Sequence, residues 1–291
     1  MLAFRLSRVA IGVAIVAGLS TAAYAAVEAM SPHVEPQKWS FDGPFGTFDR
    51  AEVQRGYQVY KEVCSACHAL SLVAYRNLTD IGLDENQIKD AIKDIQIQDG
   101  PNDVGEMFDR GAKLSDRFRK PFPNEQASRA ANNGAYPPDL SLIAKATETE
   151  SEGGIPVIRS FITKLHNTGA DHIYGVLDGY RDFTKLTADD RKSLHLPDNF
   201  KLGTGMYFNI HFKGFQIAMP PPLQDGQVTF ADGAPNKVHD MARDVATFLT
   251  WAAEPKMEER KRTGVKVVLF LLALAGLMYA IKRKVWSNVA H

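Results

Sequence analysis

The stretch Cys64-Ser65-Ala66-Cys67-His68 determines the fold and chemistry that this 291-residue sequence predicts. It holds the only two cysteines of the chain, three positions apart, with a histidine directly after the second. C-x-x-C-H is the motif for covalent attachment of a c-type haem. Because positions i, i+3 and i+4 share one face of a helical turn, both thiols can reach the porphyrin vinyl groups while the histidine reaches the iron. The motif therefore predicts one covalently bound haem c, with His68 as an axial ligand.

Two other interpretations of a C-x-x-C pair fit the sequence less well. A thioredoxin-like redox pair is found near a βαβ pattern, and none surrounds residues 50–80. A structural zinc site needs four ligands, and the sequence has no second Cys/His cluster. Haem attachment is the favoured interpretation.

The N-terminus has the pattern of a secretory signal peptide over residues 1–25. After two arginines come an apolar stretch, Val9–Leu19, and the small-residue cleavage site Ala23-Tyr24-Ala25. An uncleaved anchor is disfavoured because this apolar stretch is shorter than the ~20 residues that span a bilayer. We therefore expect export, cleavage after Ala25, and a periplasmic haem domain over residues 26–259.

A second apolar segment lies near the C-terminus. Residues 263–281 contain one charged side chain, Lys266, and would extend about 28 Å as a helix, close to the ~30 Å of bilayer hydrocarbon. A buried core helix is the alternative, but charged residues cluster on both sides. The sequence predicts a transmembrane helix over 263–281, a cytoplasmic tail over 282–291, and a single-pass protein of the bacterial inner membrane.

The net charge of zero conceals an acidic body between basic ends. Residues 26–259 contain 34 acidic and 25 basic side chains, and every Lys or Arg beyond them lies in the predicted signal peptide or after Glu259. Such a body excludes nucleic acid as an expected partner. It favours a basic protein partner, attracted over a long range.

The pattern of apolar residues predicts a mainly α-helical haem domain with long loops. Helices are expected over four segments: Asp49–Val63, Asp84–Ile95, Thr187–Leu194 and Val238–Trp251. Pro and Gly predict an extended surface arm over 26–46 and a region over 99–140 that is mostly loop. Such long loops fit a chain that wraps around a large ligand. In cytochrome c folds the first and last helices cross at the haem, so the first and fourth segments are expected to pack together.

The second axial ligand must come from elsewhere in the chain. A methionine ligand raises the potential of haem iron and suits electron transfer. Met219 precedes Pro220-Pro221-Pro222, and these prolines make a stiff strap that can hold a weak thioether with little loss of entropy. Met219 is the predicted ligand. The alternatives that stay open are Met206, His33, His166, His172, His195, His211, His239 and His291.

Several longer motifs occur in one order from about Trp39 to the C-terminal anchor. They include Ala74-Tyr-Arg-Asn-Leu78, Gln98-Asp-Gly-Pro-Asn102, Ala130-Ala-Asn-Asn-Gly134, Tyr136-Pro-Pro-Asp-Leu140 and Ile217-Ala-Met-Pro-Pro-Pro-Leu223. In these motifs the chain resembles the cytochrome c1 family, the haem subunits of bacterial and mitochondrial ubiquinol–cytochrome c reductase (cytochrome bc1) complexes.

The resemblance implies a cytochrome c-like fold with elaborated loops. The residues that it implies at the haem are Cys64, Cys67, His68, Met219, Asn132, Tyr136, Pro137 and Arg76. Single electrons would arrive from a Rieske iron–sulfur protein and leave to a soluble cytochrome c, with cytochrome b as membrane neighbour in a dimeric complex. The chain would then be an electron carrier within an oxidoreductase complex, not a catalyst by itself. One departure is that many relatives place an arginine shortly after Pro-Pro-Asp-Leu, where this sequence has Lys145 and Thr147.

Two other functions stay open at this point. A catalytic haem enzyme would need an open iron face with a distal acid or base. A c-type cytochrome subunit of another respiratory complex, such as an oxidase, would share the haem and the anchor but not the Asn-Asn-Gly and Pro-Pro-Asp-Leu loops.

Overall fold

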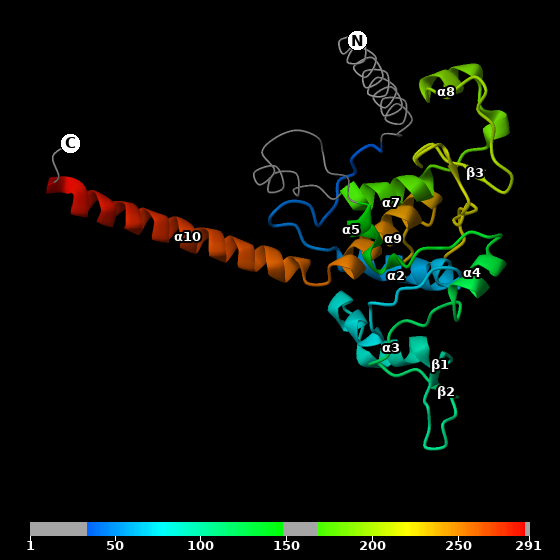
Figure 1. Cartoon of the computed structure of the whole chain (residues 1–291), viewed down its shortest axis with the longest axis horizontal. Coiled ribbons are helices and arrows are strands. Elements are labelled where there is room, and N and C mark those ends of the chain that lie inside the picture. Colours follow the sequence, from blue (N-terminus) through cyan, green and yellow to red (C-terminus); the bar gives the residue numbers. More distant parts are fainter. Residues whose placement is uncertain (1–33, 148–167, 289–291) are drawn as a thin grey trace, which may run out of the picture.

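The computed structural model describes residues 34–147 and 168–288. The predicted signal peptide, residues 1–25, lies outside the described residues. The described part is mainly helical, with two small two-stranded sheets and one long C-terminal helix that extends away from the body (Figure 1). The predicted fold class is confirmed in these respects.

Two crossing helices form the centre of the body. Helix α2 (Arg50–Glu62) begins at Asp49, whose carboxylate accepts the amide protons of Ala51 and Glu52. It packs across α9 (Val238–Ala253), as expected of the first and last helices. Gly56 allows the close approach, because a Cβ there would lie 2.0 Å from the Asp244 carbonyl oxygen.

Helix α7 (Thr168–Asp178) was not predicted from the sequence, and it packs on α9 beside η3 (Leu140–Leu142) and α5 (Ile143–Ala146). The expectation of a surface arm over 26–46 is wrong for Trp39 and Phe41, which are 5% and 0% exposed. Their rings stack on one another, and Trp39 Nε1 donates to Asp171 of α7 at 2.9 Å. Over residues 34–46 the backbone is irregular, but the aromatic side chains Trp39 and Phe41 belong to the core.

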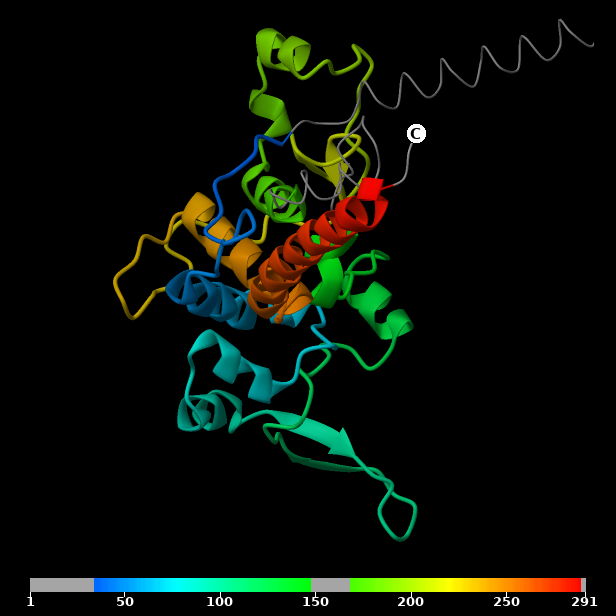
Figure 2. The same ribbon diagram turned by 90° about the vertical axis from the view of Figure 1, so that its left-hand side faces the viewer.

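The region after the haem motif forms a separate layer below the crossing helices. It contains η2 (Tyr75–Ile81), α3 (Glu85–Ile92) and a hairpin of β1 (Gln96–Asp99) and β2 (Phe108–Gly111), with Gln96 opposite Gly111. The hairpin tip projects away from the helical body (Figure 2). This hairpin and α4 (Glu125–Ala131) are the main regular elements within residues 99–140. The rest of the region is mostly loop, as the sequence predicted.

A second apolar cluster, here called the satellite lobe, is built around Leu196, Phe208 and Phe215. Its elements are η4 (Phe183–Lys185), the predicted short helix α8 (Ala188–Ser193), β3 (Tyr207–Phe208) and β4 (Gln216–Ile217). Figure 1 shows it above α7, away from the β1–β2 hairpin. The chain leaves this lobe directly into the proline strap.

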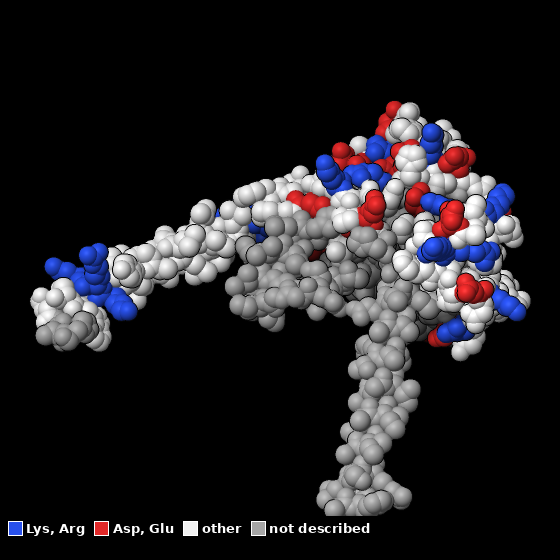
Figure 3. All heavy atoms as spheres, turned by 90° about the horizontal axis from the view of Figure 1, so that it is seen from above, with Lys and Arg blue, Asp and Glu red and all other residues white. Residues whose placement is uncertain are grey.

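The C-terminal helix α10 (Met257–Val285) begins inside the body and ends far from it. Met257 is 2% exposed, and Glu258 accepts from the Phe48 amide and pairs with Arg50 at 2.8 Å. From Val267 to Ile281 the helix is apolar and exposed, and among the described residues it is the only one long and apolar enough to cross a membrane. Basic side chains gather at its far end (Figure 3). A short 3₁₀ turn, η5 (Trp286–Asn288), follows it.

Candidate haem site

The end of α2 presents the two cysteines and the histidine in one tight turn. After Glu62 the backbone forms the 3₁₀ helix η1 (Cys64–Ala66), and the Cys64 carbonyl accepts the amide protons of Cys67 at 3.1 Å and His68 at 2.9 Å. Both thiols are free; Cys67 is exposed and Cys64 is half-buried. Burial raises the pKa of Cys64 to about 12, so its sulfur is a protonated thiol at neutral pH. The turn therefore offers two unpaired thiols from a rigid helix end.

His68 has the tautomer that a metal ligand needs. Its Nδ1 lies 2.8 Å from the carbonyl oxygen of Pro138. Because a carbonyl only accepts, Nδ1 must carry the proton, which leaves the lone pair of Nε2 free. Burial lowers the pKa of His68, an effect that the Pro138 carbonyl offsets only in part, so the imidazole is neutral. A neutral imidazole with a free Nε2, beside two free thiols, fits a c-type haem iron.

The loop that carries Pro138 is joined to the segment after the motif by several hydrogen bonds. The Leu140 amide donates to the Ala69 carbonyl at 2.8 Å, and the Ser71 amide and hydroxyl both donate to the Asp139 carboxylate. Burial raises the pKa of Asp139, but hydrogen bonds from Ser141 and Ser71 lower it overall. An ionised Asp139 thus keeps the loop against the motif. Sequence reasoning quoted this loop as a motif but did not predict the contact from Pro138 to His68.

Of the other predicted haem neighbours, Asn132, Tyr136 and Pro137 lie at the end of α4 and in the loop after it, and Arg76 lies on η2. Pro137 directly precedes the Pro138 carbonyl, and Asn132 ends α4 with its side chain donating to the Ser128 carbonyl at 2.7 Å. Tyr136 is 51% exposed, with the guanidinium of Arg129 5.4 Å from its ring centre. Arg76 is exposed on η2, where its amide donates to the Leu114 carbonyl. Contact of these side chains with haem stays a prediction.

Met219 lies half-buried at a bend between β4 and the buried Leu223. Its carbonyl oxygen accepts a hydrogen bond from the hydroxyl of Tyr180 at 3.0 Å. Tyr180 is 39 positions away in the sequence, and nothing in the local pattern pointed to it. The assignment of Met219 as an iron ligand stays a prediction.

Two further residues concern the missing arginine after Pro-Pro-Asp-Leu. Lys145 lies 3.6 Å from the carboxylate of Glu254, at the end of α9. The Thr147 hydroxyl donates to the Ile143 carbonyl of α5. Both polar groups have partners within the protein.

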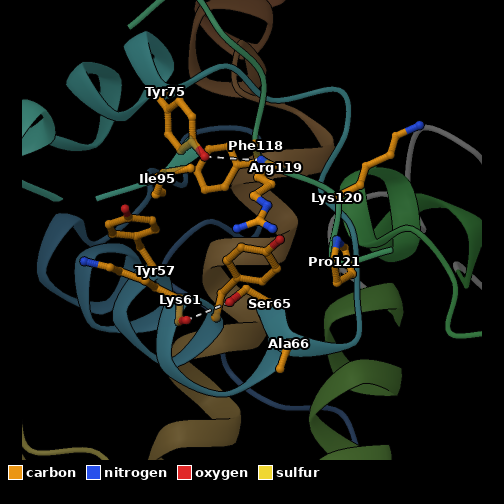
Figure 4. Close-up of a pocket in the computed structure, with 11 residues that line it drawn as sticks. Tyr57, Lys61, Ser65, Ala66, Tyr75, Ile95, Phe118, Arg119, Lys120 and Pro121 are labelled. Carbon is orange, nitrogen blue, oxygen red and sulfur yellow. Dashed lines mark hydrogen bonds between the residues drawn. The ribbon is translucent and has the colours of Figure 1, made fainter. Parts of the chain in front are cut away.

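An open recess of about 340 Å³ lies beside the motif (Figure 4). Ser65 and Ala66 contribute to its wall, together with Tyr57, Tyr60, Lys61, Tyr75, Ile95, Phe118, Arg119, Lys120 and Pro121. Its lining contains neither cysteine, nor His68, nor Met219. The recess is therefore a neighbouring surface feature and not the place where the haem-binding side chains converge.

Comparison with known proteins identifies the family. Residues 39–289 match the sequence profile of the Cytochrome C1 family. The chain belongs to the cytochrome c1 family. It is therefore a c-type cytochrome, and its one long apolar helix fits a membrane anchor.

Individual relatives agree with this assignment. "Cytochrome b/c1" of Bradyrhizobium diazoefficiens is 48% identical over 256 residues, which cover 86% of this chain but 35% of that longer protein. "Cytochrome c1-2, heme protein, mitochondrial" of Solanum tuberosum is 43% identical, with 86% and 84% covered. "Cytochrome c1" of Rhodospirillum rubrum is 39% identical, with 88% of each chain covered.

Proposed function

We propose that this chain is the haem subunit of a ubiquinol–cytochrome c reductase complex. In this role it passes single electrons from the Rieske iron–sulfur protein to a soluble cytochrome c. The observation that carries the proposal is the neutral His68, bound through Nδ1 by Pro138 and free at Nε2, in the same turn as two free thiols. The alternative, a c-type cytochrome subunit of an oxidase, is less favoured because the family match extends over the loops as well as the motif.

In the proposed site one haem c is held through thioether bonds to Cys64 and Cys67. His68 and Met219 would ligate its iron, and Asn132, Tyr136, Pro137 and Arg76 would lie beside it. The haem supplies the one-electron chemistry. The protein's own residues fix the imidazole tautomer and hold the loop over residues 138–141 against the motif.

The proposed arrangement in the membrane follows from the two ends of the chain. Residues 1–25 are a signal peptide that is cleaved, residues 26–259 are the haem domain in the periplasm, residues 263–281 cross the inner membrane, and residues 282–291 remain in the cytoplasm. The exposed apolar surface of α10 over residues 267–281 supports this, because such a helix needs lipid or another membrane helix around it.

The proposed partners are cytochrome b along α10, the Rieske protein and a soluble cytochrome c, within a dimeric complex. Nucleic acid is not expected. The excess of acidic over basic side chains in residues 26–259 favours a basic electron acceptor.

Purification of the tagged full-length chain from bacterial membranes tests the proposal. We expect cytochrome b and an iron–sulfur protein to co-purify, and the haem to stay on the polypeptide after extraction with acidified acetone. The matched control is a Cys64→Ser, Cys67→Ser double variant, from which the haem should extract. Release of the haem from the wild-type chain, or recovery of oxidase subunits in place of cytochrome b, would refute the proposal.

A further inference from the structure

We infer that Tyr180 is a positioning residue that holds the strap bearing Met219 against the haem body through one hydrogen bond. The inference rests on the proposed role of Met219 as an iron ligand. It adds a residue that no local sequence motif indicates, and it makes the stability of the ligation depend on a hydroxyl outside the strap.

The strap itself, residues 218–222, makes almost no hydrogen bonds to the rest of the described protein. Pro220, Pro221 and Pro222 lack an N–H group, so the strap cannot join a β-ladder through them. β4 ends before it at Ile217, and the next buried side chain after it is Leu223, 6% exposed. In the part of the chain that the structure describes, the hydrogen bond from Tyr180 to the Met219 carbonyl is the only one that the strap makes.

Tyr180 is well placed to hold the strap because its own backbone is fixed on both sides. It forms an antiparallel bridge with Asn209, and the Ile210 amide donates to the Gly179 carbonyl at 2.9 Å. The fully buried Asn209 side chain donates to the Val176 carbonyl of α7 at 2.7 Å. Any side chain at Gly179 would clash, since a Cβ there would lie 2.6 Å from Asn209 Oδ1.

The path from Tyr180 to the haem motif is made of packed secondary structure. Helix α7, which Asn209 binds, packs on α9; α9 crosses α2; and the end of α2 carries the motif. The Tyr180 hydroxyl therefore has a fixed position in the same body as His68. Burial raises the pKa of Tyr180, so the phenol stays a neutral donor throughout the physiological pH range.

A methionine thioether is a weak, neutral ligand, so the time that it spends on the iron depends on how well the protein holds it in place. Loss of one neutral hydrogen bond typically changes such an equilibrium by about fivefold. Tyr180→Phe removes the hydroxyl and keeps the ring, and with it the packing. The inference predicts about a fivefold increase in the fraction of molecules whose iron has lost its methionine.

The experiment uses the full-length holoprotein in detergent. Three readouts are followed: the methionine–iron charge-transfer band of the oxidised form, the rate at which the reduced form binds carbon monoxide, and the reduction potential. In Tyr180→Phe we expect a weaker band, carbon monoxide binding about fivefold faster and a lower potential. Tyr174→Phe, which removes a hydroxyl from the neighbouring helix α7, should match the wild type in all three.

Met219→Leu separates this inference from the assignment of the ligand itself. If Met219→Leu abolishes the band and Tyr180→Phe leaves all three readouts unchanged, the ligand assignment stands and the inference is overturned. If Met219→Leu has no effect, the ligand assignment is wrong. If Tyr180→Phe takes up less haem than the wild type, a second variant, Tyr180→Trp, supplies an N–H donor on a different ring. A methionine–iron band that is stronger in Tyr180→Trp than in Tyr180→Phe supports the hydrogen bond. Equal bands overturn the inference.

Discussion

The ion pair that locks the α2–α9 crossing gives the sharpest quantitative prediction. Arg55 donates from Nε to one carboxylate oxygen of Asp244 at 2.8 Å and from Nη2 to the other at 3.0 Å, and its Nη1 reaches Asp232 at 3.1 Å. The Asp244 side chain is 5% exposed and that of Arg55 is 20% exposed. Removal of one partner of such a pair leaves a buried, unpaired charge, which costs about 3–5 kcal/mol. We expect Arg55→Gln to lower the free energy of unfolding by about 3 kcal/mol near pH 8.

The pH dependence of this loss follows from Asp244. Burial raises its pKa to about 6, although Arg55 lowers it. Because the folded protein holds the Asp244 proton more tightly than the unfolded chain does, protonation of Asp244 stabilises the fold. This contribution to the free energy of unfolding is complete below the unfolded-state pKa, near 4, and is lost as pH rises through the folded-state pKa. Without Arg55 the folded pKa rises further, so this loss continues to higher pH. The stability deficit of Arg55→Gln relative to wild type should therefore grow as pH rises from about 5 to about 8.

The assay is chemical denaturation of the full-length holoprotein in detergent, followed by far-UV circular dichroism at both pH values. Lys89→Gln is the matched control, because its pair with Glu85 is exposed and should contribute less than about 1 kcal/mol. The double variant Arg55→Gln, Asp244→Asn should recover part of the lost stability, since it leaves no buried charge. A deficit below about 1 kcal/mol near pH 8, or one that shrinks as pH rises, would refute this account of the crossing.

Three further predictions concern the same scaffold. Gly56→Ala should destabilise the fold by more than about 3 kcal/mol or prevent haem uptake, because the added Cβ would lie 2.0 Å from a backbone oxygen of α9. Thermal unfolding measures the loss of stability. Asp139→Asn should lower the free energy of unfolding by about 1–2 kcal/mol at neutral pH. The pKa of Asp139 is lowered in the folded state, so the wild type loses this stability as pH falls below about 4, and the variant should not show that loss. Unfolding measured across an acid titration checks the sign. Glu258→Gln should cost about 1 kcal/mol and speed proteolysis at the base of α10, because the charge that accepts from the Phe48 amide is lost; limited digestion in detergent detects it.

The parts of the fold that the sequence predicted are those with a strong local signal. Asp49 and the apolar spacing after it indicated α2, and the amphipathic pattern from Val238 indicated α9. The C-terminal apolar run indicated α10, but its first turn is part of the body because Met257 is buried, and composition alone does not show that. The haem motif was recognisable because its five residues act within a single turn.

The parts that escaped prediction depend on contacts between distant segments. Trp39 looked like a residue of a surface arm, because its burial depends on Asp171, which is 132 positions away. The carbonyl that orients His68 belongs to Pro138, 70 positions away. Every residue has a backbone carbonyl, so the sequence does not show which one accepts a hydrogen bond from His68. Tyr180 was not singled out for the same reason.

The α2–α9 crossing unites the two sides of the proposed iron site in one rigid unit. On one side, α2 leads within two residues to the turn that carries His68's neighbours Cys64 and Cys67. On the other, α9 supports α7, from which the chain leads to Tyr180 and so to the Met219 carbonyl. In an electron carrier the charge of the iron changes but its ligands do not. A scaffold that keeps both proposed ligands in place therefore reduces the structural rearrangement that accompanies each electron transfer. A weakened crossing in Arg55→Gln should therefore loosen the Met219 ligation as well as the fold, so this variant should also bind carbon monoxide faster than Lys89→Gln.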